Sequence, residues 1–218
     1  MTARRNASGS RSGSTKKKAK RSPRKVFFFG AGKADGRAEM REVLGGKGAN
    51  LAEMSRLGVP VPPGFTIGTA VCAEFNRLGG RLPAGVRKDA LAALSRIKKL
   101  MGAGFGDSAN PLLVSVRSGA RVSMPGMMDT VLNLGLNDAT AEGLALRSGT
   151  PRFAYDSYRR FVQMYGDVVL GLRPESDSAA DPFEALLERK KQARGVELDT
   201  ELSADDLREL VAEFKAEI

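Results

Sequence analysis

Histidine is absent from this sequence of 218 residues. Because histidine is the commonest general acid and base, and a common phosphoryl carrier and zinc ligand, its absence excludes several kinds of site. These are imidazole-based triads, zinc hydrolysis through histidine ligands and phosphohistidine relays within the chain. Any chemistry here must use lysine, arginine, carboxylate and backbone amide groups.

Cysteine is nearly absent as well. The single residue, Cys72, excludes an intramolecular disulfide framework and fits a reducing, cytoplasmic setting. No apolar run approaches the roughly 18 to 20 residues that span a bilayer, so no membrane partner is expected.

Acidic residues are missing from residues 1–25, which contain ten of the 35 lysines and arginines. The remainder holds 25 basic and 25 acidic residues and is formally neutral. Residues 1–24 are poor in apolar side chains, so we expect a disordered basic tail. The tail resembles an organelle transit peptide in composition but has no Leu, Ile or Phe for an apolar helix face. It also lacks aromatic residues for base stacking, so a nucleic-acid partner is not expected.

Residues 25–137 show a mixed pattern of strands and helices. Apolar or β-branched runs predict strands at 25–30, 65–67 and 112–117. A loop is expected from 31 to 43. Helices are predicted from about Ala49 to Leu57, from a Thr69 cap to Leu78, and from near Pro83 to Gly102.

Residues 138–218 are expected to be helical throughout. One helix begins at Pro151, with an apolar stripe that includes Tyr158, Val162, Tyr165 and Val169 and continues to Leu172. Further helices are predicted to begin at Asp181-Pro182 and at Ser203, where Asp206 completes a capping box. The last helix carries an apolar side that extends to Ile218, and we interpret the chain end there as a truncation.

The first candidate site is Gly45-Gly46-Lys47-Gly48-Ala49-Asn50. Glycines let backbone amides approach a phosphate closely, a helix amino terminus adds partial positive charge, and Lys47 adds a full one. This string is not the common phosphate loop, because no Ser or Thr follows the lysine to hold magnesium. A loop with a solvated lysine would explain the string equally well.

The second candidate is the segment from Ser115 to Arg121, which places Arg117 at the end of a predicted strand. Strand ends that open into glycine-containing loops build ligand sites in α/β folds, and a guanidinium group binds phosphate oxygens in pairs. Arg117 is therefore a candidate phosphate ligand. Arg121 is interpreted as an ordinary exposed arginine.

The third candidate is the loop from Val122 to Thr130, which contains three methionines. Methionines are commonly core filler, but Pro125-Gly126 interrupts any helix that would place them on one face. Backbone amides and the hydroxyls of Ser123 and Thr130 could close over a polyphosphate.

Taken together, four strings resemble the start of the pyruvate, phosphate dikinase family. They are GGKGANLAEM (45–54), LGVPVPPGFTI (57–67), LLVSVRSGARVSMPGMMDTVLNLGLN (112–137) and PRFAYDSYRRFVQMYGDVVLG (151–171). Related phosphoenolpyruvate synthases share shorter versions of the first and third strings. The Met-Pro-Gly-Met-Met-Asp-Thr loop, followed by the Pro-Arg-Phe segment, favours the dikinase.

The resemblance implies an α+β fold: an incomplete ATP-grasp nucleotide-binding domain with an inserted helical subdomain. The implied domains are a tail at 1–24, a mixed nucleotide-binding part at 25–137 and a truncated helical part at 138–218. The implied ligand is ATP, with magnesium ligands expected beyond Ile218. The residues implied to bind ATP are Lys47, Arg117, Gly126, Met128, Asp129 and Thr130.

By the same resemblance, the parent enzyme transfers the β-phosphoryl group of ATP to a histidine, phosphorylates inorganic phosphate, and passes the first group to pyruvate. The products are phosphoenolpyruvate, AMP and pyrophosphate. The phosphohistidine and pyruvate-binding domains are missing here, so no catalytic residue is assigned and the chain alone is expected to be inactive. The parent is expected to be a homodimer.

Three alternatives remain open on the sequence. The chain could be a non-catalytic nucleotide-binding module that retains the phosphate site. It could be a piece of a phosphoenolpyruvate synthase. It could also use its basic tail for nonspecific, salt-dependent association with nucleic acid.

Overall fold

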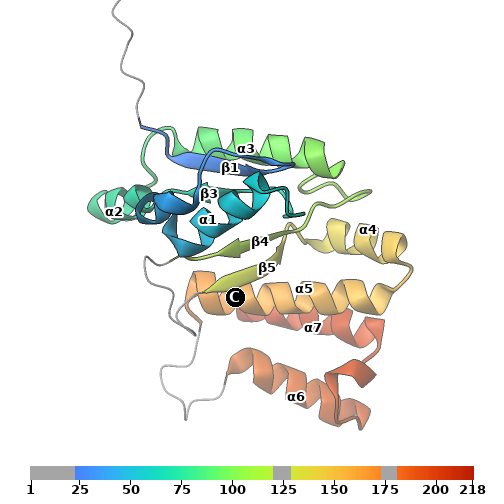
Figure 1. Cartoon of the computed structure of the whole chain (residues 1–218). Helices are drawn as coiled ribbons and strands as arrows, with labels where there is room; N and C mark the ends of the chain where they lie inside the picture. The colour runs from blue at the N-terminus through green and yellow to red at the C-terminus, as the bar shows by residue number, and fades with distance from the viewer. Residues whose placement is uncertain (1–22, 120–128, 173–180) are drawn as a thin grey trace, which may run out of the picture.

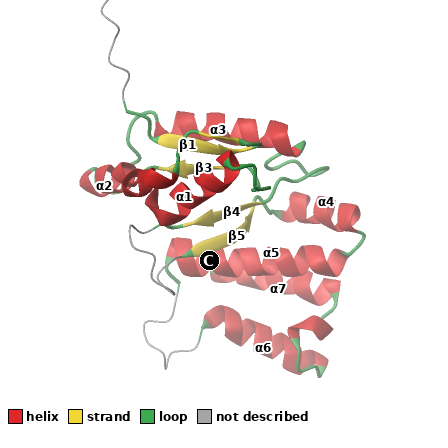
Figure 2. Ribbon diagram, viewed as in Figure 1, coloured by secondary structure: helices red, strands yellow, loops and turns green. Residues whose placement is uncertain are grey.

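A computed structural model describes residues 23–119, 129–172 and 181–218 (Figure 1). Strands are concentrated before residue 135 and helices dominate after it (Figure 2). The strands are β1 (Val26–Gly30), β2 (Lys33–Ala34), β3 (Gly64–Ile67), β4 (Val114–Arg117) and β5 (Thr130–Leu134). The α-helices are α1 (Arg41–Arg56), α2 (Thr69–Arg77), α3 (Val86–Met101), α4 (Asp138–Ser148), α5 (Pro151–Tyr165), α6 (Pro182–Arg194) and α7 (Ala204–Glu217). Short helical segments are η1 (Ala38–Met40), η2 (Gly166–Leu170) and η3 (Asp199–Glu201).

The first sheet has the order β2-β1-β3 and is antiparallel. Alternate residues of β1 face opposite sides. Phe27 packs with Leu44 and Ala49 of α1, whereas Phe28 packs with Ile97 of α3. The sheet therefore lies between two helices, as Figure 1 shows, and this explains why every residue of β1 is buried.

The beginning of α1 differs from the sequence expectation of a loop up to Val43. Helical structure begins at Arg41, but Gly45 interrupts it with a φ of 69° and a ψ of 167°. A positive φ is easily adopted only by glycine, so the chain bends there and a second helical run starts at Gly46. The expected glycine-rich helix start is present, preceded by a helical turn that the sequence did not indicate.

A two-stranded antiparallel hairpin, β4–β5, follows the first sheet. The expected strand at 112–117 begins only at Val114, and β5 was not expected at all. The pairing contains an irregularity between Val114 and Val116, and Asn133 on the opposite strand has a φ of 57°. One additional residue on β5 accounts for this bulge. β5 also packs against α5.

The helices α4 to α7 enclose the largest apolar core of the described residues. Its fully buried members include Phe183 of α6 and Leu207, Leu210 and Phe214 of α7. The rings of Phe183 and Phe214 meet edge to face, with centroids 5.1 Å apart. Helical structure after residue 137 is therefore confirmed wherever the chain is described.

The apolar stripe predicted along residues 151–172 is only partly buried. Ala154, Tyr158 and Val162 are in the core, but Tyr165 and Val169 are 36% and 51% exposed. The α-helix changes at Gly166 to the π-helical segment η2, which has more residues per turn. A stripe spaced for an α-helix therefore leaves the core at this point. Ile218, expected on the buried side of the last helix, is 48% exposed because it follows the end of α7.

The helix starts predicted at Asp181-Pro182 and at Ser203 are correct. The Asp181 carboxylate accepts hydrogen bonds from the Phe183 and Glu184 amides, and Ser203 forms the expected capping box with Asp206. Thr69 does not cap α2. Its hydroxyl instead donates to the Glu42 carbonyl at 2.6 Å and ties α2 to α1.

The α+β fold class is confirmed by this combination of small antiparallel sheets and packed helices. The division into parts at residue 137 stays a prediction. Within residues 23–119, 129–172 and 181–218, no helix is both long enough and apolar enough to cross a membrane.

Candidate phosphate-binding site

Lys47 lies in the first turn of the helical run that starts after the Gly45 bend. Its side chain is half-buried. Amides in the first turn of a helix generally lack acceptors within the helix and carry partial positive charge, to which the lysine would add a full charge. A helix start beside Lys47 is therefore present, although Gly46 and Gly48 lie within the helical run and do not precede it. The binding role of Lys47 stays a prediction.

The two glycines beside Lys47 have different surroundings. A Cβ on Gly46 would meet no atom within 4 Å, so the backbone is open at this position. A Cβ on Gly48 would come within 2.8 Å of Thr66 Cγ2 on β3. Gly48 thus lets α1 sit closely on the sheet, while Gly46 leaves space for a ligand near the helix start.

Arg117 is the last residue of β4, and its side chain is exposed. It pairs with Thr130, the first residue of β5. Next to this pair, the Ser118 amide donates to the Asp129 carbonyl at 3.0 Å, and the Ser118 hydroxyl reaches the same oxygen at 3.3 Å. The structure therefore brings Arg117, Asp129 and Thr130 together at one end of the hairpin.

Two of the six residues expected to bind ATP, Gly126 and Met128, lie outside the described residues, as do Ser123 and Arg121. Lys47 comes from a different element: α1 contacts the three strands of the first sheet. A joint action of Lys47 and the hairpin residues on one ligand stays a prediction.

A metal site does not form among the described residues. In residues 23–119, 129–172 and 181–218, no group of three or more cysteine, aspartate or glutamate side chains is placed to hold a metal ion. The available donors therefore do not fit a magnesium ion held by protein side chains alone. The expectation that its ligands lie beyond Ile218 stays untested.

A known family matches the segment that contains Lys47. The family model described as "Pyruvate phosphate dikinase, AMP/ATP-binding domain" matches residues 41–85, which include α1 and Lys47. That domain is of the ATP-grasp type. Arg117 and the hairpin lie outside the matched range.

Similarity to curated proteins extends over most of the chain. It is 55% identical over 192 residues to "Pyruvate, phosphate dikinase, chloroplastic" of Mesembryanthemum crystallinum, covering 88% of this chain and 20% of that protein. It is 54% identical over 193 residues to "Pyruvate, phosphate dikinase" of Rhizobium meliloti (strain 1021), covering 88% and 21%. The protein of the same name from Clostridium symbiosum is 53% identical over 182 residues, covering 84% and 20%.

The chain thus spans about a fifth of the length of the curated relatives it matches. Over most of its own length, the chain is therefore similar to pyruvate, phosphate dikinases, and one segment of it matches their AMP/ATP-binding domain.

Proposed function

We propose that this chain is the ATP-binding part of a pyruvate, phosphate dikinase and that it holds the phosphates of ATP between α1 and the β4–β5 hairpin. The observation that supports this most is the pairing of Arg117 with Thr130, beside Asp129, at the end of the hairpin. Arg117 and Thr130 are separated along the sequence, but the pairing of β4 with β5 places them next to one another.

The proposed contacts follow from the chemistry of each group. Lys47 supplies a point charge beside the amides of the helix start, and the open backbone at Gly46 admits a phosphate oxygen. Arg117 supplies a planar guanidinium that can bind two oxygens of one phosphate. Thr130 adds a hydroxyl next to it.

We further propose that the segment containing Gly126, Met128 and Asp129, which precedes Thr130, binds the polyphosphate of ATP. The family resemblance assigns this role to the segment. At the carboxyl end of this segment, the Asp129 carbonyl accepts two hydrogen bonds from Ser118, which fix Asp129 beside the end of β4.

In the whole enzyme, we propose that the bound ATP gives its β-phosphoryl group to a histidine on another domain, and that the group finally reaches pyruvate. The sequence contains no histidine, so the acceptor must come from a different part of the parent protein. When bound, Mg²⁺ would neutralise charge on the phosphate oxygens. The role of this chain is to position the phosphates.

Calorimetric titration of the 218-residue chain with ATP and with AMP tests the proposal. Because the proposed contacts are to phosphates, we expect saturable binding of ATP and at least tenfold weaker binding of AMP. Equal affinity for the two nucleotides would place recognition on the base or ribose and contradict the phosphate site. The absence of ATP binding at millimolar concentration would also contradict it.

A second candidate is a stand-alone nucleotide-binding module, because the family model that matches this chain is that of an AMP/ATP-binding domain alone. The intact mass of the native protein distinguishes the two. An antibody against residues 151–172 should detect a species far heavier than 23.3 kDa if the residues belong to a full dikinase. A native species of 23.3 kDa would favour the module.

A cytoplasmic location and a homodimeric parent remain part of the proposal. Some relatives are named as chloroplastic, whereas those of Rhizobium meliloti and Clostridium symbiosum are not. The phosphoenolpyruvate synthase alternative has no support among the three relatives named above, all of which are dikinases.

A further inference from the structure

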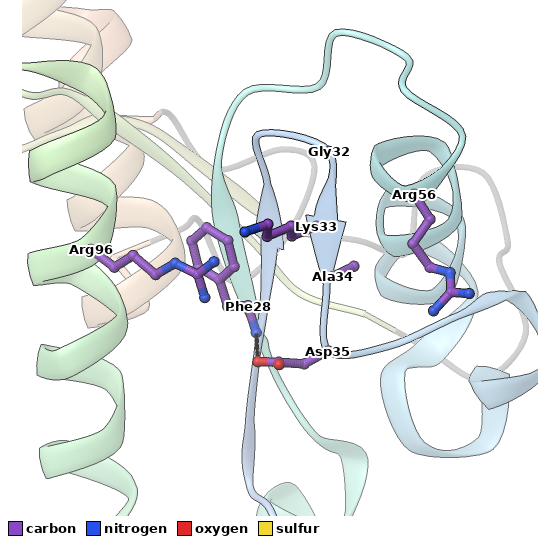
Figure 3. A pocket seen from close by; sticks show the side chains of 7 residues that line it. All are labelled: Phe28, Gly32, Lys33, Ala34, Asp35, Arg56 and Arg96. Carbon is purple, nitrogen blue, oxygen red and sulfur yellow. Dashed lines mark hydrogen bonds between the residues drawn. The ribbon is translucent and has the colours of Figure 1, made fainter.

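A cavity of about 500 Å³ lies beside the β1–β2 turn (Figure 3). Its wall includes three cationic side chains from three separate elements: Lys33 of β2, Arg56 at the end of α1, and Arg96 of α3. Figure 3 shows Arg96 reaching over the Phe28 ring and Lys33 projecting toward the same ring, with Arg56 on the other side of the hairpin. All three cations are exposed.

In the part of the chain that the structure describes, Lys33, Arg56 and Arg96 form no ion pair with an acidic side chain. The one carboxylate in the wall, Asp35, is already engaged: it forms an ion pair with Arg24 and accepts a hydrogen bond from the Phe28 amide at 2.9 Å. The cavity therefore has excess positive charge.

The walls of the cavity are held in place by internal contacts. The Ser55 hydroxyl, which is 1% exposed, accepts a hydrogen bond from the Gly30 amide at 2.9 Å and donates to the Lys33 carbonyl at 3.2 Å. It thus fixes the β1–β2 turn against the end of α1. The Arg96 guanidinium lies 3.5 Å from the centroid of the Phe28 ring, a cation–π contact that orients it.

The charge and side-chain types of the cavity wall indicate which class of ligand it could bind. Several cations around one hollow favour an anion with more than one negative charge, and arginine favours the planar oxygen pairs of phosphate. A nucleobase has no aromatic surface on which to stack, because Phe28 is 5% exposed and Arg96 covers its ring. A small oxyanion of the phosphate class fits these features.

This cavity is separate from the proposed nucleotide site. Lys47 and Arg56 lie toward opposite ends of α1, nine residues apart. At 1.5 Å per residue, this spacing corresponds to about 14 Å along the helix axis. A phosphate bound at Lys47 cannot also fill the cavity at Arg56.

We propose that the cavity between β2, the end of α1 and α3 is a second anion site that binds a small, multiply charged oxyanion of the phosphate class. The site does not depend on the proposed dikinase function, because it shares no residue with the predicted nucleotide ligands.

The test uses inorganic pyrophosphate as the probe and amide chemical shifts of the 218-residue chain as the readout. We expect saturable shifts at Gly32, Ala34 and Asp35. The affinity should fall at least tenfold in Lys33→Gln and in Arg96→Gln.

One control variant locates the binding. Arg189→Gln removes an exposed cation from α6, far along the chain from the cavity. It should change the pyrophosphate affinity measured at Gly32, Ala34 and Asp35 by no more than about twofold. Arg56→Gln, at an exposed helix end, provides a further cavity variant if Arg96→Gln fails to fold.

Three results would overturn the proposal. They are the absence of saturable shifts, shifts confined to residues 46–48, and an equal loss of affinity in Arg189→Gln. Shifts confined to residues 46–48 would mean that pyrophosphate binds as ATP phosphates do. An equal loss in Arg189→Gln would mean that only the overall charge matters. A titration with ATP in place of pyrophosphate, which should shift residues 46–48 first, distinguishes a free oxyanion from the phosphates of a nucleotide.

Discussion

Arg117 pairs with Thr130 across the antiparallel β4–β5 ladder. The pairing links the two ends of the loop that the family resemblance assigns to the polyphosphate. The strand end that carries the Arg117 guanidinium is thereby fixed beside the strand beginning that carries the Thr130 hydroxyl, and we propose that both bind one phosphate. This relationship leads to the first prediction.

Replacing Arg117 should weaken ATP binding by more than the loss of one positive charge would, because the paired hydrogen bonds are lost as well. In Arg117→Gln, we expect the affinity of the chain for ATP to fall about ten- to a hundredfold, since a hydrogen bond to a charged group contributes roughly 1.5–3 kcal/mol. Arg117→Lys should recover only part of it, because lysine cannot bind two oxygens in a plane. Calorimetric titration measures both. Full recovery by lysine, or an equal loss in Arg189→Gln, would contradict a paired contact.

The helical core should depend strongly on Phe214. Its side chain is fully buried against Phe183, so Phe214→Ala should lower the free energy of unfolding by about 3–5 kcal/mol through lost contacts and a cavity. Phe153→Ala is the matched control: Phe153 is 52% exposed, and the change should be within about 0.5 kcal/mol. Urea unfolding followed by circular dichroism gives both values. Similar losses in the two variants would argue against this core.

Two glycines in helices should respond in opposite ways to alanine. A Cβ on Gly143 would lie 1.5 Å from the Ser108 carbonyl oxygen, so Gly143→Ala must displace backbone and should destabilise the chain by about 3 kcal/mol. A Cβ on Gly46 would meet no atom within 4 Å. Gly46→Ala should therefore leave stability unchanged or raise it by about 0.5–1 kcal/mol. Thermal unfolding compares them, and a Gly143→Ala chain as stable as wild type would refute the close packing of α4 on the loop at Ser108.

Stability should depend on pH through Asp206. The Ser203 hydroxyl, which donates to this carboxylate at 2.6 Å, holds the pKa of Asp206 below its usual value, and the Ser203 amide and Arg194 add to the effect. A depressed folded-state pKa stabilises the fold at pH values above the unfolded pKa of about 3.9, and this contribution is lost as the pH falls through the folded-state pKa.

Asp206→Asn should therefore cost about 2 kcal/mol at pH 7 and progressively less below pH 4. Urea unfolding of wild type and variant at both pH values measures the difference. A difference that is the same at pH 7 and pH 3 would show that the charge of Asp206 contributes nothing. The variant Asp205→Asn, at a more exposed neighbouring position, serves as the control.

Features determined by local chemistry were predictable from the sequence. The caps at Asp181 and Ser203 depend on residues within one turn, so short-range pattern was sufficient. β1 was also predictable, because an apolar run forms it. The helix start beside Lys47 was predictable from the consecutive glycines. The sequence also indicated Arg117 at a strand end.

Features that depend on distant parts of the chain were not predictable. β5 forms because Thr130 and Val131 pair with residues on the far side of a loop, and its own sequence alternates only weakly. The exposure of Val169 depends on the change to a π-helical turn at Gly166, and no single residue in the sequence predicts this change. The cavity at Lys33, Arg56 and Arg96 arises only when three elements pack together.

The central claim is that α1 and the β4–β5 hairpin bind one ATP molecule together. Hydrogen–deuterium exchange of the 218-residue chain, with and without saturating ATP, tests it most directly. The claim predicts that ATP slows exchange in residues 41–56 and in residues 129–134, while residues 182–194 of α6 remain unchanged. Slowing in neither segment, or in only one of them at saturating ATP, would contradict it.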